Sequence, residues 1–395
     1  MSSLTRDDVE LARAMPLSRY LYIIILVMIL LVQHSFTSVS GDSSSSSTSD
    51  GKSKPDTWGA QRVIVVLIEF EDVGHRKAKN EVANAVFGDL NRYVTEVSYN
   101  TTWITGTVTD WVRLPYEISY YGRDFMLGID CEVRKLFSDS VHAADSFVDF
   151  RSYRHIMIVH AGKGQETSGA LSDLWSSYYN FRSPVYADGL ILNNAIIVPE
   201  EQADNKGILG VYAHEFMHSL GLPDLYPAFG LNSKYVGLWD VMDAGFRNGK
   251  PPGSSPPHPS AWSKLTLGWP INTRTIYAGS VETLTISPFE VATKEVQVVM
   301  LPVTPGRYYL VEVRQQLGFD KPLPDQGILI TYVDEKLPTQ SGMVRVVDST
   351  PSAPDLQSAT FKAGQTFSDS SKLIRLSVVF EKGSYKLHID RRIPQ

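Results

Sequence analysis

The chain has 395 residues, of which 43% are hydrophobic and 20% charged, so it is long enough for two or three globular domains with a sizeable core. Its 43 acidic and 37 basic side chains give a formal net charge of -6, which argues against a surface for nucleic acid or an anionic membrane. The single cysteine, Cys131, excludes an intramolecular disulfide and a cysteine-based zinc site, and we expect it to be a small buried residue.

The amino terminus has the pattern of an export signal. Residues 20–32 are almost entirely aliphatic, a length typical of a signal-peptide core and short for a bilayer-spanning helix. Arg13 and Arg19 precede this stretch, and the next charge is Asp42, so the asymmetry predicts export of the rest of the chain. We therefore interpret residues 1–40 as a signal peptide or an uncleaved membrane anchor.

A serine-rich stretch follows at residues 41–60. It has almost no apolar side chains to bury, so it predicts a disordered linker, with folded structure beginning near Gln61. The protein would then be secreted, or held at the outer face of the cell membrane by its amino-terminal segment.

Strands and helices alternate in residues 61–270, which predicts an α/β catalytic domain. Continuous apolar runs predict buried strands, and apolar residues at helical spacing predict helices. The expected strands are 62–70, 101–114, 155–160 and 190–198, and the expected helices are 81–97, 130–144 and 205–220.

Residues 271–395 have a different pattern, with short β-prone runs separated by turn residues. This pattern predicts an all-β, sandwich-like module. The main expected strands are 296–303, 308–314, 328–333, 373–380 and 385–390.

The segment that most clearly predicts catalytic chemistry is the H-E-x-x-H motif at His214, Glu215 and His218. On a helix, residues four apart lie about 6 Å apart along one face, so both imidazoles can bind one zinc ion. Glu215 projects about 100° away and can take a proton from a metal-bound water as its oxygen attacks a carbonyl. The alternative for this pentapeptide is a pair of structural histidines.

Gly221 and Asp224 extend the motif. Glycine tolerates the left-handed conformation that ends many helices, so the chain can turn back there and bring the Asp224 carboxylate to the ion as a third ligand. A purely structural Pro-Asp turn is the alternative for Asp224. Further along, Met242 lies in a glycine-bounded segment that resembles the Met-turn of metzincins, an apolar floor beneath the metal ligands.

These segments resemble the M6 family of metallopeptidases, the secreted proteases similar to immune inhibitor A. The similarity is carried by HEFMHSLGLPDLY, by GLWDVMDAG and by the stretch 258–269, with weaker matches from residue 62 to residue 369. The resemblance implies a zincin fold of the metzincin type, proteolysis of extracellular proteins, and His214, His218 and Asp224 as zinc ligands with Glu215 as catalyst.

Several other residues are candidates for supporting roles. His258 is a rival ligand or a packing residue, and His160 is a substrate contact or a structural histidine. Tyr226 and Tyr235 are alternative hydrogen-bond donors to an oxyanion. Residues that could line the substrate side are Gln165, Glu166, Asp173 and Trp175, and those that could form a structural calcium site are Asp320, Asp325 and Asp334.

The resulting hypothesis is an exported zinc endopeptidase that acts on proteins or peptides. Two other interpretations remain open: a retired peptidase scaffold that binds partners through its β module, and a zinc hydrolase of a non-peptide amide or ester.

Overall fold

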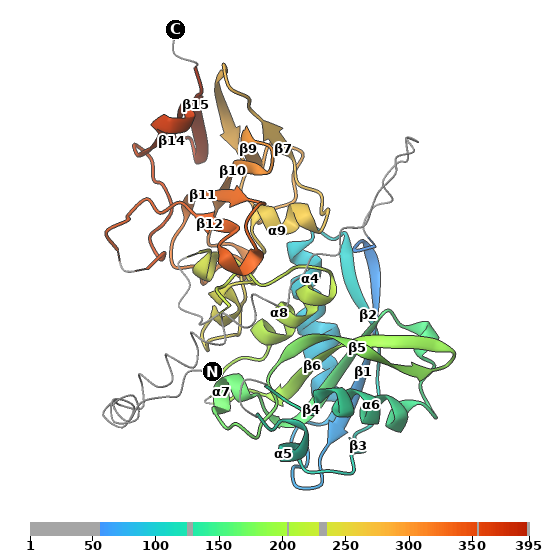
Figure 1. The fold of residues 1–395 in the computed structure, drawn as a ribbon. Helices are drawn as coiled ribbons and strands as arrows, with labels where there is room; N and C mark the ends of the chain where they lie inside the picture. The colour runs from blue at the N-terminus through green and yellow to red at the C-terminus, as the bar shows by residue number, and fades with distance from the viewer. Residues whose placement is uncertain (1–55, 125–128, 204, 229–234, 354, 393–395) are drawn as a thin grey trace, which may run out of the picture. The chain divides into compact units, whose positions relative to one another are not determined.

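The computed structural model describes residues 56–124, 129–203, 205–228, 235–353 and 355–392 (Figure 1). The expected signal segment at 1–40 lies outside these residues, as does most of the expected linker, and the first strand begins at Gly59. Within the described ranges, no helix has the length and apolar character needed to cross a membrane.

A six-stranded sheet forms the first part of the fold, with the order β2-β1-β4-β6-β5 and β3 paired to β1. Neighbouring strands are parallel except β5, which is antiparallel to β6 and forms an edge. The strands are β1 (Gly59–Glu69), β2 (Thr102–Val108), β3 (Val112–Arg113), β4 (His155–Lys163), β5 (Ser177–Ala187) and β6 (Leu190–Glu201). Strand β5 was not among the expected elements.

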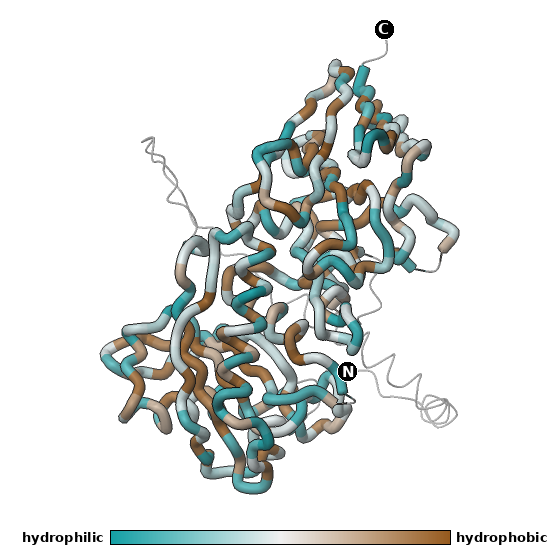
Figure 2. Tube along the Cα trace, turned by 180° about the vertical axis from the view of Figure 1, so that it is seen from behind, coloured by the Kyte–Doolittle hydropathy of each residue, from teal (hydrophilic) through white to brown (hydrophobic). Residues whose placement is uncertain are grey.

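The alternation of side chains along β1 explains why this strand is central. Val63, Val65 and Leu67 enter one apolar core, whereas Ile64 and its alternate neighbours enter the core on the opposite face. A strand buried on both faces needs a continuous apolar run, which β1 has from residue 63 to residue 68. In Figure 2 the hydrophobic stretches accordingly follow the strands of this sheet.

Helices cover both faces of the sheet (Figure 1). One face packs against α8 (Leu209–Ser219) and a continuous helical run made of α3 (Lys79–Ala83), the π-helical η1 (Asn84–Leu90) and α4 (Asn91–Val97). The other face packs against α5 (Ile118–Tyr121) and α6 (Val133–Ala144). The short elements are η2 (Phe150–Ser152), α7 (Gln165–Ser168), η3 (Gly237–Trp239), η4 (Ala244–Arg247) and α9 (Ala261–Thr266).

The prediction of a buried Cys131 was wrong. Helix α6 begins at Val133, and Cys131 lies in the preceding turn, where it is exposed. Asp130 has a φ of 48°, a left-handed conformation that no helix interior accepts, so the helix cannot start as early as expected.

Two sheets form the carboxy-terminal part. The five-stranded sheet has the order β12-β11-β10-β9-β7 and the four-stranded sheet the order β13-β14-β15-β8, and apolar residues of both meet in one core. The strands are β7 (Thr273–Thr275), β8 (Val281–Ile286), β9 (Val298–Thr304), β10 (Arg307–Arg314), β11 (Gly327–Asp334), β12 (Val344–Val346), β13 (Thr366–Asp369), β14 (Ile374–Glu381) and β15 (Ser384–Asp390); the 3-10 turns are η5 (Gly318–Asp320), η6 (Thr339–Ser341) and η7 (Ser370–Lys372).

The five-stranded sheet also shares a core with the first part of the fold. Its strands send Val299 and Val311 into the core between the two sheets, whereas the alternate residues Val298 and Leu310 join the core that contains Met217 of α8. The β part therefore packs directly on the segment that follows α8 in sequence, and it contributes to the support of that helix.

Candidate metal centre

Helix α8 presents an apolar stripe to the core and its polar residues to a pocket. Leu209, Tyr212 and Phe216 are buried, and the Tyr212 hydroxyl donates to the Pro199 carbonyl on β6 at 3.0 Å. This contact fixes the helix on the sheet. The helix begins at Leu209 rather than at the expected residue 205.

The end of α8 turns as the glycine predicts. Gly221 has a φ of 107°, and the Leu222 N–H donates to the Met217 carbonyl at 3.1 Å, a bond that closes the last turn. The chain reverses there and brings Asp224 beside the two histidines.

Three donor atoms converge at this point. His214 Nε2 and His218 Nε2 are 3.1 Å apart, and Asp224 Oδ1 lies 3.2 Å from the first and 3.1 Å from the second. Within the described ranges, these three residues form the one group of histidine, cysteine or carboxylate side chains close enough to hold a metal ion. The structure thus brings the three predicted ligands together.

The Nδ1 atom of each histidine ring is hydrogen-bonded to a backbone carbonyl. His214 Nδ1 lies 2.8 Å from the Val241 carbonyl and His218 Nδ1 lies 2.7 Å from the Leu222 carbonyl. A carbonyl accepts only, so each Nδ1 carries the proton, and each Nε2 turns a lone pair toward the Asp224 carboxylate. Three lone-pair donors this close together repel one another unless a cation lies among them.

The neighbouring carboxylates favour a positive charge at this point, which a second proton on His214 supplies when no metal ion is bound. Burial opposes a charge on His214, but the carboxylates of Asp224 and Glu215 outweigh it and raise the pKa of His214 to about 9. Burial raises the pKa of Asp224, and the two histidines more than reverse this and hold it below its usual range. Tetrahedral zinc with bonds of about 2.0–2.1 Å needs donor atoms about 3.3 Å apart, so the observed triangle fits zinc.

Glu215 lies next to this triangle without joining it. Its carboxylate is buried, and it lines the same pocket of about 80 Å³ as the three donor residues. Burial raises the pKa of Glu215, and the neighbouring histidines oppose that rise. A carboxylate held here can accept a proton from a group that reaches the metal position.

Met242 is fully buried under the site. Its N–H donates to Asp240 Oδ1 at 2.8 Å, and its carbonyl accepts from the Leu225 N–H at 2.9 Å. The residue before it, Val241, supplies the carbonyl that holds His214. The segment around Met242 therefore orients both His214 and the chain that carries Asp224.

Comparison with known proteins agrees with this geometry. Residues 145–270 match the family model described as immune inhibitor A peptidase M6, catalytic domain. The chain carries an M6-family peptidase catalytic domain. The match includes α8, the Asp224 turn and Met242.

Two curated proteins are similar to this part of the chain, and the name of one of them is that of a metalloprotease. The chain is 27% identical over 263 residues to immune inhibitor A of Bacillus thuringiensis subsp. alesti, which covers 49% of the chain and 38% of that protein. It is 26% identical over 238 residues to the pre-pro-metalloprotease PrtV of Vibrio cholerae serotype O1 (strain M66-2), which covers 50% of the chain and 25% of that protein. The chain thus spans well under half the length of either relative.

The structure separates the two tyrosine candidates of the M6 domain. Tyr226 lines the metal pocket, its ring stacks on His214 at 6.0 Å, and its hydroxyl hydrogen-bonds the Asp224 carboxylate. Tyr235 instead packs under the Arg345 guanidinium and is not among the residues that line this pocket.

The proposed substrate-side residues divide in the same way. Glu166 and Trp175 line the metal pocket, and Glu166 accepts a hydrogen bond from the Ser176 hydroxyl at 2.7 Å. Gln165 instead binds the Asp124 carboxylate at 2.7 Å, and neither it nor Asp173 is among the lining residues.

The other two candidate histidines, His160 and His258, do not line the metal pocket. His160 is fully buried, and its Nδ1 donates to the Ala161 carbonyl at 2.9 Å. His258 is also fully buried, and its ring lies between Glu96 and the Lys264 ammonium. The packing interpretation of His258 therefore agrees with the structure, and the rival-ligand interpretation does not.

The calcium prediction also fails for the described residues. Each of the three aspartates faces a cation of the protein: Asp320 pairs with Arg314, Asp325 with Lys362 and Asp334 with Arg307. Because each carboxylate is already paired with its own partner, the three do not form a common site.

Sequence reasoning missed two neighbours of the M6 centre. The Gln340 amide donates to Asp224 Oδ2 at 3.3 Å, and the ring of Phe246 contacts His214 with 5.3 Å between ring centroids. Gln340 lies more than a hundred residues from Asp224 in the chain, so no local pattern indicates it. Phe246 directly follows the quoted GLWDVMDAG segment, and its proximity to Met242 was an available signal.

Proposed function

We propose that this chain is an exported zinc-dependent endopeptidase with a metzincin-like zincin domain and a sandwich-like β module. The observation that carries the proposal is the triangle of His214, His218 and Asp224 donor atoms beside the buried carboxylate of Glu215. The names and the family match of its relatives support it, as does the aliphatic amino-terminal segment.

The donor set favours zinc over a harder cation, because two imidazoles and one carboxylate suit its borderline-soft character. When bound, zinc supplies a Lewis acid that polarises a carbonyl and lowers the pKa of water. Glu215 would accept the proton of the attacking water and deliver it to the leaving amine. The Tyr226 hydroxyl, which hydrogen-bonds Asp224 in this structure, would turn to donate to the oxygen of the attacked carbonyl.

The edge strand β5 offers a place for the substrate. Ser176 and Ser177, at its beginning, line the metal pocket, and an edge strand has main-chain groups that can pair with an extended peptide. Main-chain pairing suits a substrate of many residues better than a small amide or ester. This geometry favours proteins or peptides over the non-peptide alternative.

The Glu215→Gln variant tests the proposal. It keeps the size of the side chain and removes its basicity, so we expect a folded protein with wild-type zinc content and casein cleavage reduced by at least about 10³-fold. Glu282→Gln, which alters an exposed carboxylate on β8 paired with Arg274, serves as the matched control. Elemental analysis, circular dichroism and digestion with and without a chelator give the three readouts.

Each alternative predicts a different result. A retired scaffold would cleave neither casein nor peptides with zinc bound. A non-peptide hydrolase would act on small amides or esters in a chelator-sensitive way and leave casein intact. Normal cleavage by Glu215→Gln would contradict the role of this carboxylate.

A further inference from the structure

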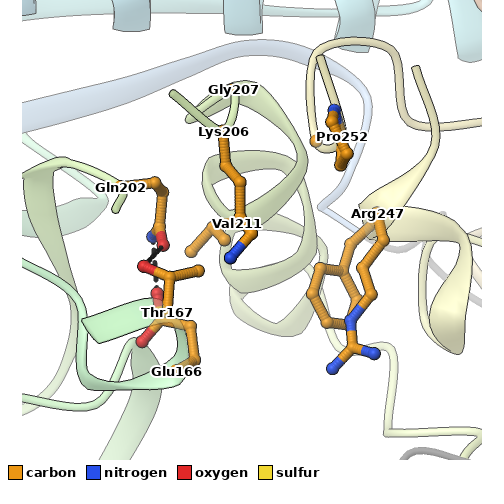
Figure 3. A pocket seen from close by; sticks show the side chains of 10 residues that line it. Glu166, Thr167, Gln202, Lys206, Gly207, Val211, Arg247 and Pro252 are labelled. Atoms are coloured by element: carbon orange, nitrogen blue, oxygen red, sulfur yellow. Dashed lines mark hydrogen bonds between the residues drawn. The ribbon is translucent and has the colours of Figure 1, made fainter. Parts of the chain in front are cut away.

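A second pocket adjoins the metal site on the amino-terminal side of α8. It has a volume of about 290 Å³ and is larger than the metal pocket (Figure 3). Its lining comes from α7, from the loop that follows β6, from α8, and from the segment after Met242. The lining residues are Glu166, Thr167, Gln202, Lys206, Gly207, Val211, Phe246, Arg247, Pro252 and Gly253.

The two pockets share walls, so a substrate that reaches one reaches the other. Glu166, Val211 and Phe246 line both. Val211 precedes His214 and Glu215 by three and four residues, which places it about one helical turn away on the same helix. A substrate side chain within one or two residues of a bond held at the metal position would therefore reach the second pocket.

The ring of Phe246, which lines both pockets, lies between His214 and the Arg247 guanidinium. One side of the ring contacts His214, and the Arg247 guanidinium lies over it at 5.2 Å from the ring centroid. Arg247 is exposed, and within the described ranges its guanidinium forms no ion pair. Lys206 supplies a second cationic side chain to the lining, and in Figure 3 its ammonium points into the space between Thr167 and Arg247.

The one carboxylate in the lining is already satisfied. Glu166 accepts hydrogen bonds from the Ser176 hydroxyl at 2.7 Å, from the Ser176 N–H at 3.2 Å and from the Gln202 amide. It is held against the wall opposite Arg247 (Figure 3). Because Glu166 is committed to these donors, the Arg247 guanidinium makes its own side of the pocket a favourable place for a negative charge.

The far wall of the pocket is set by the backbone. The Gly207 N–H donates to the Pro252 carbonyl at 2.8 Å, and the Gly210 N–H donates to the Gly253 carbonyl at 2.8 Å. The approach is so close that a Cβ on Gly210 would lie 1.8 Å from the Phe246 carbonyl oxygen. The Gly253 N–H also donates to the Arg247 carbonyl at 3.1 Å, so these bonds fix the backbone that carries Arg247 against α8.

We propose that this pocket receives an acidic side chain of the substrate, with the carboxylate paired to Arg247 and its methylene groups on Val211 and Phe246. The inference rests on the proposed peptidase function and names a feature of its substrates. The apolar floor and the guanidinium fork match glutamate better than a bare anion, because a fork binds a carboxylate through two parallel hydrogen bonds.

The test begins with a cleaved sequence. Digestion of a peptide library by the zinc-loaded protein, read by mass spectrometry, gives the cleaved bonds. One cleaved peptide is then synthesised with glutamate, glutamine or lysine at each of the two positions on either side of the bond. At one position we expect kcat/KM to be at least about tenfold higher for glutamate than for glutamine, and lower still for lysine.

Two variants of Arg247 locate that preference. Arg247→Met should bring the glutamate-to-glutamine ratio at this position close to one, and Arg247→Glu should make lysine the preferred residue. The matched control is Arg92→Met, because Arg92 is an exposed arginine that lies over the ring of Phe319 and belongs to neither pocket. This control should keep the wild-type ratio.

The outcomes separate the two proposals. Cleavage with no acidic preference, or a preference that survives both Arg247 variants, overturns the assignment of this pocket and leaves the peptidase intact. If the wild-type protein with zinc cleaves no peptide at all, the peptidase function and the pocket assignment fail together.

Discussion

The side-chain amide of Gln340 lies 3.3 Å from Oδ2 of Asp224, the oxygen that does not face the two histidines. Gln340 belongs to η6, after strand β11, whereas Asp224 belongs to the turn after α8. The β part of the chain therefore holds the Asp224 carboxylate in place from the side that faces away from His214 and His218.

Replacing Gln340 with alanine should weaken zinc binding. An outer hydrogen bond of this kind orients the carboxylate, and its loss typically lowers metal affinity by about 10- to 100-fold. Competition with a chromophoric chelator measures the change directly and does not depend on activity. Gln357→Ala is the matched control, because Gln357 is an exposed glutamine whose amide binds the Asp355 carboxylate. An unchanged zinc affinity in Gln340→Ala would show that the contact has no role in the site.

Arg314 should be essential for folding. This side chain is fully buried, donates to the Trp239 carbonyl at 2.9 Å, and pairs with Glu312 at 3.0 Å and Asp320 at 2.6 Å. Arg314→Met would leave three buried carboxylates, those of Glu312, Asp320 and Glu290, without this cation, so we expect a loss of about 3–5 kcal/mol in the free energy of unfolding. Urea unfolding measures it.

The control for this prediction is an exposed ion pair. Arg274→Met removes the partner of Glu282 and should cost less than about 1 kcal/mol. Because Trp239 lies just before Met242, surviving protein with Arg314→Met should also bind zinc less tightly. A loss of stability no larger than that of the control would contradict the importance of this buried network.

Helix α8 and its metal donors were predictable because their signals are local. His214 and His218 share a face by helical geometry, and Gly221 permits the reversal that returns Asp224. The strands with continuous or alternating apolar residues were predictable for the same reason.

Strand β5 was not predictable in that way. It is an edge strand that contains Pro184, its register shifts between Asn180 and Val185, and Tyr186 is exposed, so no clean alternation marks it. Long-range relationships such as the contact of Gln340 with Asp224, or the choice of which face of β10 joins the core that contains Met217, depend on how the two parts pack. Neither leaves a trace in nearby sequence.

Acid should destabilise the protein partly through His155 and His160. Burial lowers the pKa of each to about 4, whereas an unfolded histidine has a pKa of about 6.5. Between these values the unfolded chain binds protons that the folded chain excludes, so stability is present above pH 6.5 and falls as the pH falls to 4. At pH 5 the linkage amounts to about 2 kcal/mol for each histidine.

His160→Leu removes one of the two groups. Its free energy of unfolding, measured by urea at pH 7.5 and at pH 5, should fall about 2 kcal/mol less than that of the wild-type protein. The exposed His142 of α6 provides the control for loss of a histidine, as His142→Leu. If the variant and wild-type proteins lose the same stability between the two pH values, His160 takes up no extra proton on unfolding, and its pKa is not lowered in the folded protein.

Tyr226 and Tyr235 differ in position, and this difference yields a final pair of variants. Of these two tyrosines, Tyr226 lines the metal pocket. Tyr226→Phe removes its hydroxyl, so we expect kcat for peptide cleavage to fall by about 10²-fold with little change in KM. Tyr235→Phe removes a hydroxyl from a ring that packs on Arg345, and it should keep wild-type kinetics. Zinc content must be measured for both, because the Tyr226 hydroxyl also contacts Asp224. A fall in kcat with full zinc occupancy would assign Tyr226 to the attacked carbonyl, whereas equal activity of the two variants would leave the oxyanion without a tyrosine donor.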